Sequence, residues 1–404
     1  MTHAPARLYY EDAYQLTFTS TVTDVRPHGD AVAVTLTSSA FYPTSGGQLH
    51  DVGTLTPETE GPPAHVLDVI DGDDGHVWHV LDRALAPGTA VRGDIDPPRR
   101  ADHRQQHTGQ HVLSASFART VCAETRSVHL GAEVCTLDLD REVTDDELAM
   151  AEADANVVVC DDRDVHVRMV DADAAVALPL RRPTRRTGTV RLVDIAGHDL
   201  SACGGTHVRR TGEIGAILVL GTERVRGGTR VTFVCGQRAV SSHRRLRTIL
   251  DEAARDLSVG RVELPAAVRR LQDDLRTTRR TLDVAREQLA ALEARSLAQA
   301  FEPRRGYALL VAHLDAADAT DLRRSASTLV ETPGRLVVLI GGPAPHALVV
   351  ARSADLEGHD AGRLARALAA ALGGKAGGRA DLAQGGGLTA SLADLRREVD
   401  AALA

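Results

Sequence analysis

Two short stretches decide the fold of this chain: HTGQHVLSA at residues 107–115 and CGGTHV at residues 203–208. The first lies within residues 99–121, which have helical spacing and no internal proline. His107 and His111 therefore share one face of a predicted helix, because residues four apart lie above one another. In the second stretch, two glycines between Cys203 and His207 indicate a tight turn that lets both side chains point the same way.

Together these stretches predict a metal site. Three imidazoles and one thiolate suit zinc better than magnesium or calcium, which prefer oxygen ligands. On spacing alone, the alternative of two core histidines and a buried cysteine stays open. The pair His103 and His107 has the same spacing as His107 and His111.

The flanking segments predict a mixed α/β (α+β) protein of several domains. Residues 1–95 contain β-branched or alternating stretches between Gly, Pro and Asp turns, which indicates a small N-terminal β-barrel. Residues 96–250 mix helical and strand patterns and predict a two-layer α/β core around the metal ligands. A chain of 404 residues is long enough for two or three domains.

A long helical linker is predicted in residues 251–302. Seven side chains at alternating steps of four and three form an a/d seam: Leu271, Leu275, Thr278, Leu282, Ala285, Leu289 and Leu292. Such a helix needs a partner, so we expect a homodimer unless the seam packs against its own chain. Residues 303–404 show three buried-strand patterns and a helix starting near His359, which predicts a small C-terminal α/β domain.

Bulk composition is that of an ordinary globular chain, with 43% hydrophobic and 25% charged residues. Five cysteines are too few for a disulfide framework and indicate a reducing compartment, so we expect a cytoplasmic protein. No apolar run of about 18 residues predicts a membrane span, and the start has no signal-peptide pattern. The net charge of -8 argues weakly against a nucleic-acid partner, but arginines cluster locally, as at residues 180–188.

Four motifs, in one order along the chain, resemble those of a known family. HTGQHVLSA and CGGTHV look like the paired motifs of the alanyl-tRNA synthetase editing domain and its free-standing relatives, the AlaX proteins. FYPTSGGQLHDVG, residues 41–53, resembles the glycine-rich motif ahead of the zinc helix. GGKAGGRADLAQGGG, residues 373–387, resembles the glycine-rich signature of the synthetase C-terminal domain, shared with DHH-type phosphoesterases.

The resemblance runs from about residue 8 to residue 390 and is closest to the long form of AlaX. It implies an editing module, a helical linker and a C-terminal domain of the DHH-associated type. Few residues precede residue 41, so we expect no aminoacylation domain.

The same resemblance implies one zinc ion per chain and these ligands: His107, His111, Cys203 and His207. It points to Gln48 as an active-site residue and to Thr108 as a contact to the substrate amino acid. Gly46 and Gly47 would let the backbone approach the site closely. Two further residues are weaker candidates for substrate or tRNA binding: Asp51, whose alternative is a turn acid, and Arg230, whose alternative is a structural arginine.

The function implied is trans-editing: hydrolysis of mischarged Ser-tRNA(Ala), with Gly-tRNA(Ala) as a further candidate substrate. The partner would be the acceptor stem and aminoacyl end of tRNA(Ala). Four protein ligands close a tetrahedral zinc, whereas a catalytic zinc keeps one position open. Two roles for the ion therefore stay open: it activates water, or it only positions the substrate. One alternative is a zinc-containing tRNA-binding protein without hydrolytic activity. A second, a phosphoesterase, needs a DHH triplet, which the sequence lacks.

A separate hypothesis concerns the C-terminal domain. Lys375 is the only lysine in the chain, and it lies with Arg379 in the glycine-rich segment. Glycines that expose backbone N–H groups beside two cations suit phosphate binding. We therefore expect residues 303–404 to bind the body of the tRNA; an ordinary glycine-rich turn is the alternative.

Overall fold

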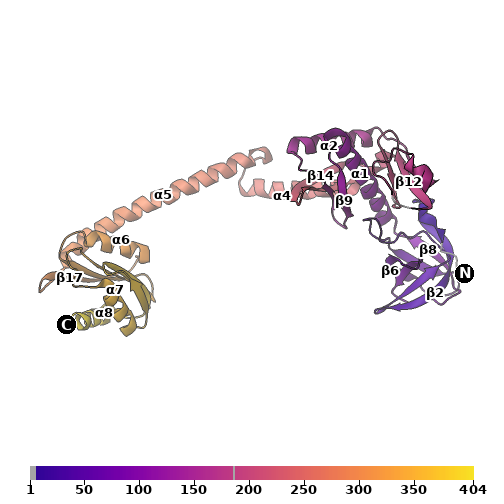
Figure 1. Ribbon diagram of the computed structural model, residues 1–404. Helices are drawn as coiled ribbons and strands as arrows, with labels where there is room; N and C mark the ends of the chain where they lie inside the picture. Colours follow the sequence, from indigo (N-terminus) through magenta and orange to yellow (C-terminus); the bar gives the residue numbers. More distant parts are fainter. Residues whose placement is uncertain (1–5, 185–186) are drawn as a thin grey trace. The chain divides into compact units, whose positions relative to one another are not determined.

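The computed structural model describes residues 6–184 and 187–404. The chain divides into two compact units, Met1–Glu252 and Ala253–Ala404, and Figure 1 gives the element labels used below. Among the described residues, no helix is long and apolar enough to cross a membrane.

The first unit begins with a closed six-stranded barrel, as predicted. Around the barrel the strands follow one another in the order β2 (Thr17–His28), β3 (Ala31–Leu36), β7 (Val77–Leu81), β6 (Ala64–Asp71), β5 (Gly53–Pro57) and β8 (Ala90–Ile95). Alternate side chains of β2, including Phe18 and Val22, are buried, as expected for a strand with one face inward. Outside the barrel, β1 (Ala6–Arg7) pairs with β4 (Ser38–Ser39), and a short helix follows at Leu8–Tyr10.

Two antiparallel sheets, two longer helices and most of a third, α4 (Gly236–Asp256), make up the rest of this unit. One sheet has the order β14 (Ile217–Val225), β15 (Gly228–Cys235), β10 (Cys135–Leu139) and β9 (Thr125–Leu130); the other has β11 (Val165–Asp171), β12 (Thr189–Ile195) and β13 (Asp199–Ala202). The helices are α1 (Pro97–Val121) and α2 (Asp145–Cys160), with a short α3 (Ala172–Val176). Phe117, Val158 and Phe233 meet in one buried cluster. A mixed α/β class is therefore confirmed, whereas the two-layer arrangement stays a prediction.

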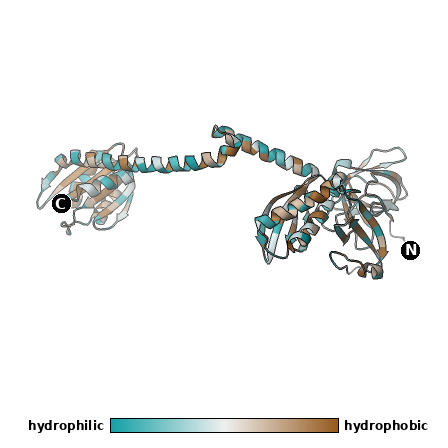
Figure 2. Ribbon diagram, turned by 90° about the horizontal axis from the view of Figure 1, so that it is seen from above, coloured by the Kyte–Doolittle hydropathy of each residue, from teal (hydrophilic) through white to brown (hydrophobic). Residues whose placement is uncertain are grey.

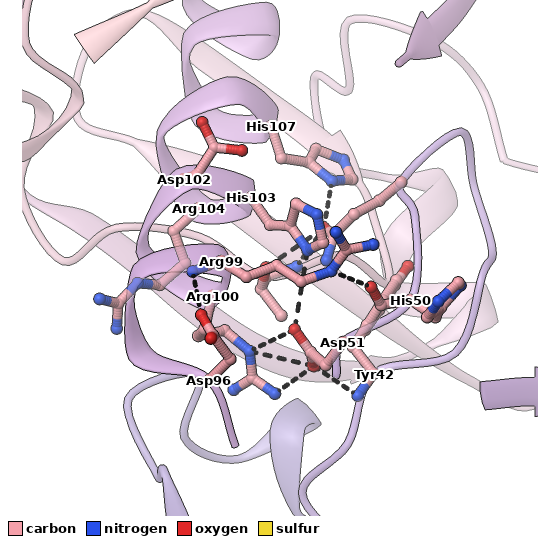
Figure 3. A network of polar contacts seen from close by, with 12 residues as sticks. Tyr42, His50, Asp51, Asp96, Arg99, Arg100, Asp102, His103, Arg104 and His107 are labelled. Atoms are coloured by element: carbon pink, nitrogen blue, oxygen red, sulfur yellow. Dashed lines mark hydrogen bonds and ion pairs between the residues drawn. The ribbon is translucent and has the colours of Figure 1, made fainter. Parts of the chain in front are cut away.

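Helix α1 starts where the sequence supplies helix-start signals. The Asp96 side chain accepts a hydrogen bond from the Arg99 amide at 2.8 Å, and proline occupies the first helical position. Within this helix, Arg100 is fully buried and pairs with the equally buried Asp51, with 2.5 Å between Nη2 and Oδ2 (Figure 3). Arg100 also donates to the carbonyl oxygens of Ala13 and Ala40. This clamp fixes the glycine-rich loop of residues 41–53 against the start of α1.

The second unit begins with helices. Helix α4 (Gly236–Asp256) leads into it, and after a short turn at Arg261–Glu263 the chain forms α5 (Leu264–Leu297). Near the end of α5, Ala290 and Ala294 are buried, and Ala294 packs into a cluster with Leu310 and Leu322. The leucines of the predicted seam are about half exposed: Leu271, Leu275, Leu282, Leu289 and Leu292. The long helix is as predicted, and the homodimer stays a prediction.

The C-terminal domain is a six-stranded sheet with helices. Its order is β16 (Glu302–Arg304), β17 (Tyr307–Leu314), β18 (Arg335–Gly341), β19 (His346–Arg352), β21 (Leu382–Leu388) and β20 (Lys375–Gly378). Helix α6 (Ala319–Leu329) joins the parallel pair β17 and β18, and α7 (Ala361–Ala371) and α8 (Leu392–Leu403) follow. The central strands are strongly hydrophobic in Figure 2, because both faces of the sheet are covered by buried clusters. The glycine-rich segment forms the β20–β21 hairpin at the sheet edge.

Candidate metal centre and its pocket

Four side chains from two distant segments converge in the first unit. The donor atoms of His107, His111, Cys203 and His207 all lie within 4.8 Å of one another. The Cys203 Sγ is 3.2 Å from His107 Nε2 and 3.4 Å from His207 Nε2. The three histidines are buried, and Cys203 is partly exposed. The i, i+4 spacing on α1 brings the first pair together, and the turn after β13 brings the second.

The turn that carries Cys203 is held by a buried arginine. The Nη1 group of Arg191 donates to the carbonyl oxygens of Cys203, at 2.9 Å, and Gly205, at 3.0 Å. Any side chain at position 205 would collide with His107, since a Cβ there would lie 2.1 Å from its Cε1. Glycine at this position therefore reflects a close approach of backbone to ligand.

The outward nitrogen of each imidazole has its own partner. His107 Nδ1 lies 2.8 Å from Gln48 Oε1, and His111 Nδ1 lies 2.8 Å from Asp199 Oδ2. His207 Nδ1 lies 3.2 Å from the hydroxyl of Thr108. A ligand histidine whose other nitrogen is hydrogen-bonded is fixed in both tautomer and ring orientation.

These partners determine where the protons lie. Gln48 Oε1 also accepts from the backbone amide of Thr206 at 3.1 Å, so it acts as an acceptor toward His107. The Thr108 hydroxyl donates to the carbonyl oxygen of Arg104, so it accepts from His207. The carboxylate of Asp199 has no proton to donate, so it accepts from His111. Each imidazole therefore carries a proton on Nδ1 and directs Nε2 toward Cys203.

This donor set fits a zinc ion. Three Nε2 atoms and a thiolate are suitable ligands for a tetrahedral zinc ion. Such a site also needs a hydrogen-bond partner for the other nitrogen of each histidine, and here each Nδ1 has one. Burial alone would raise the pKa of the Cys203 thiol, but the surrounding imidazoles lower that pKa well below its ordinary value of 9.0. Burial lowers the pKa of His207 to about 3. These two shifts favour a thiolate at Cys203 and a neutral imidazole at His207, whereas Cys203 and Asp199 outweigh burial and raise the pKa of His111 to about 9, so a metal would have to displace a proton from that ring.

Asp199 belongs to a small buried network. Its Oδ1 accepts from Arg181 Nε at 2.7 Å, and both carboxylate oxygens lie within hydrogen-bond distance of the Ser201 hydroxyl. Burial alone would raise the pKa of Asp199, but His111 and Arg181 outweigh it and hold the pKa far below the ordinary value. Asp199 is therefore a carboxylate that supports His111, one of the four candidate ligands.

A pocket of about 590 Å³ opens beside the cluster. It is lined by Gly46, His107, Gln110, His111, Thr125, Val128, Arg181, Arg182, Pro183, Thr184, Ser201, Ala202 and Cys203. Its volume lies within the range of small-molecule sites, about 300–1,000 Å³. A second cavity of about 40 Å³ lies between the cluster and the side chains of Tyr9, Tyr10 and Tyr42.

The three residues predicted in the glycine-rich loop, Gly46, Gly47 and Gln48, lie at different positions relative to the pocket. Gly46 lines both cavities. Gly47 has a φ of 84°, and a Cβ there would lie 3.1 Å from the Val128 carbonyl oxygen, so this position favours glycine. Gln48 is buried and reaches the site only through His107 and Thr206.

Thr108 and Asp51 do not line either pocket; both are fully buried, and Asp51 is engaged by Arg100. His103 Nδ1 lies 3.6 Å from Asp51 Oδ1 and takes no part in the cluster, so the pairing of His107 with His111 is the one that converges.

The remaining predicted residues lie outside the pocket. Arg230 on β15 is paired with Asp138 at 2.7 Å. In the second unit, Lys375 is exposed on β20, and Arg379 is exposed and paired with Asp381. Two arginines of the cluster at residues 180–188, Arg185 and Arg186, fall outside the described residues.

Three residues of the site were missed in the sequence: Asp199, Ser201 and Arg181. Strand alternation was the available signal for the first two, because residues 199 and 201 share one face of a strand that ends one residue before Cys203. In the sequence, Arg181 stands out only as part of the arginine cluster at residues 180–188. Nothing in its local pattern indicates a buried carboxylate 18 positions away.

Two family models match parts of the chain. Residues 190–231 match the threonyl and alanyl tRNA synthetase second additional domain, which includes the Cys203 turn. Residues 306–404 match the DHHA1 domain. The crystal structure of the C-Ala domain from Aquifex aeolicus alanyl-tRNA synthetase matches with 25% identity and a TM-score of 0.23, covering 24% of this chain and 96% of that domain.

Relatives that match almost the whole of this chain include alanine–tRNA ligases. The chain is 33% identical over 400 residues to the enzyme of Halorubrum lacusprofundi, covering 96% of this chain and 42% of the ligase. It is 32% identical over 388 residues to that of Pyrococcus abyssi, covering 94% and 41%. The chain thus spans less than half the length of these relatives.

Proposed function

We propose that this chain, which is related to the alanyl-tRNA synthetases over almost its whole length, is a zinc-dependent hydrolase of mischarged Ser-tRNA(Ala). The observation that carries the proposal is the four-donor cluster opening onto a pocket of about 590 Å³. The bond to be cut is the activated ester between the amino acid and the terminal ribose. Gly-tRNA(Ala) is a further candidate substrate.

A zinc ion bound by the four side chains would supply a positive centre that orients the aminoacyl group or polarises its carbonyl. Around it, the chain provides neutral polar groups on the pocket wall, among them Gln110, Thr125 and Ser201. The buried pair Gln48 and Thr108 acts through the ligands: Gln48 orients His107, and Thr108 orients His207. We therefore assign both as positioning residues rather than substrate contacts.

The test is a deacylation assay with Ser-tRNA(Ala) and Ala-tRNA(Ala). We expect Ser-tRNA(Ala) to be cleaved at least about 100-fold faster, because a site that hydrogen-bonds a hydroxyl strongly rejects the analogue without it. Equal rates on the two substrates would contradict a hydroxyl-reading pocket. No cleavage of either would favour the second candidate, a zinc-containing tRNA-binding protein, for which the same cluster is the supporting observation.

The variant Gln48→Ala separates positioning from substrate contact. Losing the partner of a ligand histidine lowers metal affinity by roughly 10–100-fold, so zinc affinity and the hydrolysis rate should fall together. A slower reaction at unchanged zinc affinity would instead place Gln48 against the substrate.

For the second unit we propose binding of the tRNA body by residues 303–404. Two exposed cations support this proposal: Lys375 lies on the glycine-rich edge strand β20, and Arg379 directly follows that strand. Glycines there leave few side chains between the backbone and a phosphate. We expect Lys375→Ala to reduce the slope of log affinity against log salt by about one, as for one lost phosphate contact.

A chain ending at Glu252, the boundary of the first unit, should bind tRNA more weakly while keeping its zinc. Identical salt curves for the full chain, the shortened chain and Lys375→Ala would show that this unit does not hold RNA. Dimer formation through the exposed leucines of α5 would then be the better account of it.

A further inference from the structure

One wall of the metal-site pocket is formed by two consecutive arginines on the segment that follows α3. The backbone amide of Arg181 donates to the carbonyl oxygen of Leu200 at 2.9 Å, and its side chain reaches Asp199. Arg182 Nη1 donates to the carbonyl oxygen of Arg126 at 3.3 Å. The segment is thus attached to β13 through one arginine and to β9 through the other, and both strands contribute residues to the pocket.

This wall of the pocket is positively charged, whereas the whole chain is negatively charged. The chain has a formal net charge of -8, yet no described residue that lines the pocket is acidic. Asp199 offsets the charge of Arg181 from behind the wall. Arg182 is exposed and forms no ion pair with any residue in the described ranges. A positive recess beside a metal-ligand cluster attracts an anion.

Arg181 lines the pocket and has hydrogen-bonding capacity left. A guanidinium group carries five N–H donors in a fixed plane. Asp199 uses the Nε donor, and Ser201 receives a bond from Nη2 at 3.3 Å. Within residues 6–184 and 187–404, no acceptor contacts Nη1. Because its backbone and one edge are fixed, the free edge of Arg181 is a pre-positioned donor pair.

We propose that Arg181 and Arg182 form a phosphate-binding subsite for the 3′-terminal nucleotide of the RNA substrate. This inference rests on the proposed function, since it names how the RNA end is held at the pocket. Arg182 is available to exchange its long contact to a carbonyl for a charge-assisted bond to phosphate. Arg181 has two roles, because the side chain that faces the phosphate also holds Asp199 and, through it, His111.

The first test measures binding of adenosine and of adenosine 5′-monophosphate to the zinc-loaded full chain. Wild type should bind the monophosphate more tightly, and the ratio of the two affinities measures the phosphate contact. In Arg182→Gln this ratio should fall roughly tenfold, as for the loss of one charged hydrogen bond, with zinc content unchanged. In Arg181→Gln the ratio should fall as well, and a chelator should remove zinc faster, because Asp199 loses its fixed partner.

A matched control is Arg224→Gln, which removes the same charge from an 84% exposed side chain on β14, away from the pocket. It should leave both the ratio and the zinc unchanged. The KM for Ser-tRNA(Ala) should rise in Arg182→Gln with kcat nearly unchanged, which ties the subsite to RNA rather than to a free nucleotide.

The phosphate subsite is overturned if Arg182→Gln and wild type prefer the monophosphate equally, or if Arg224→Gln loses the preference to the same extent. A lost preference without a raised KM for tRNA also overturns the assignment to RNA. The proposed function fails separately: a chain that discriminates the nucleotides but hydrolyses no aminoacyl-tRNA keeps the subsite and loses the hydrolase.

Discussion

Replacing Cys203 with alanine is expected to reduce bound zinc from one ion per chain to less than about a tenth. The thiolate is the only anionic ligand in the cluster, and a protein zinc site with four ligands is worth on the order of 10 kcal/mol. Removing the thiolate leaves three neutral imidazoles around a dication. Metal analysis of protein passed through a desalting column, at a pH near 7, measures the effect directly.

The control for this prediction is Cys160→Ala, because Cys160 is exposed at the end of α2 and has no part in the cluster. It should retain full zinc. A His107→Ala, Cys203→Ala double variant with full zinc would show that the metal, if bound, is held elsewhere. Asp199→Asn is an intermediate case: the four ligands remain, and only the support of His111 weakens, so zinc should bind roughly 10–100-fold less tightly.

The convergence of the four donor side chains could be predicted from the sequence because much of their geometry is local, and the family resemblance chose His107 and His111 over the equally spaced pair His103 and His107. Four-residue spacing on a helix and a Gly-Gly turn each place two donors on one side, so only the meeting of the two pairs had to be supposed. The barrel and the long α5 were predictable for the same reason, since period 2 and period 3.5 are visible in one dimension.

The roles of Gln48 and Thr108 could not be predicted in the same way. The motif indicated their presence near the site, but which imidazole nitrogen each one contacts depends on the packing of the loop of residues 41–53 against α1. The network of Arg181, Asp199 and Ser201 was missed because it joins an irregular segment to a strand. Such contacts leave no periodic trace in the sequence.

The glycine-rich C-terminal segment shows a different limit. Its composition suggested phosphate binding or an ordinary glycine-rich turn, and it did not show that Lys375–Gly378 and Leu382–Leu388 pair as a hairpin on the sheet edge. Strand propensity depends on the neighbouring strands more than on the residue itself, and here β19 provides the template. Local composition therefore located the segment and its cations but not its conformation.

Removing either partner of the buried Arg100–Asp51 clamp is expected to destabilise the first unit by roughly 3–5 kcal/mol. Both side chains are fully buried, so an Arg100→Ala or Asp51→Ala variant leaves an uncompensated charge away from water. Arg100 also satisfies the carbonyl oxygens of Ala13 and Ala40, and these would lose their donor. Arg100→Lys should recover only part of the loss, because an ammonium group cannot reproduce the planar set of contacts.

Thermal unfolding followed by calorimetry measures this effect, with the transition of the second unit as an internal reference. The midpoint temperature for unfolding of the first unit should fall by on the order of 10 °C, while that of the second unit stays unchanged. The exposed pair Arg224 and Glu142 is the matched control, and breaking it should cost about 1 kcal/mol or less. A similar small loss for Arg100→Ala would mean that the clamp is not a fixed link between the loop and α1.

The pH dependence of the same variants follows from the pKa of Asp51. Burial alone would raise this pKa, but the neighbouring His103 and Arg100 lower it below the ordinary value of 3.8. A carboxyl group with a lowered pKa in the folded state stabilises the protein above its ordinary pKa, and this stabilisation is lost as the pH falls through the folded-state value. The stability gap between wild type and Asp51→Asn should therefore narrow as the pH falls below about 4. A gap that does not narrow in acid would show that the carboxylate is not the stabilising form, and Arg100 would then owe its burial to the carbonyl oxygens alone.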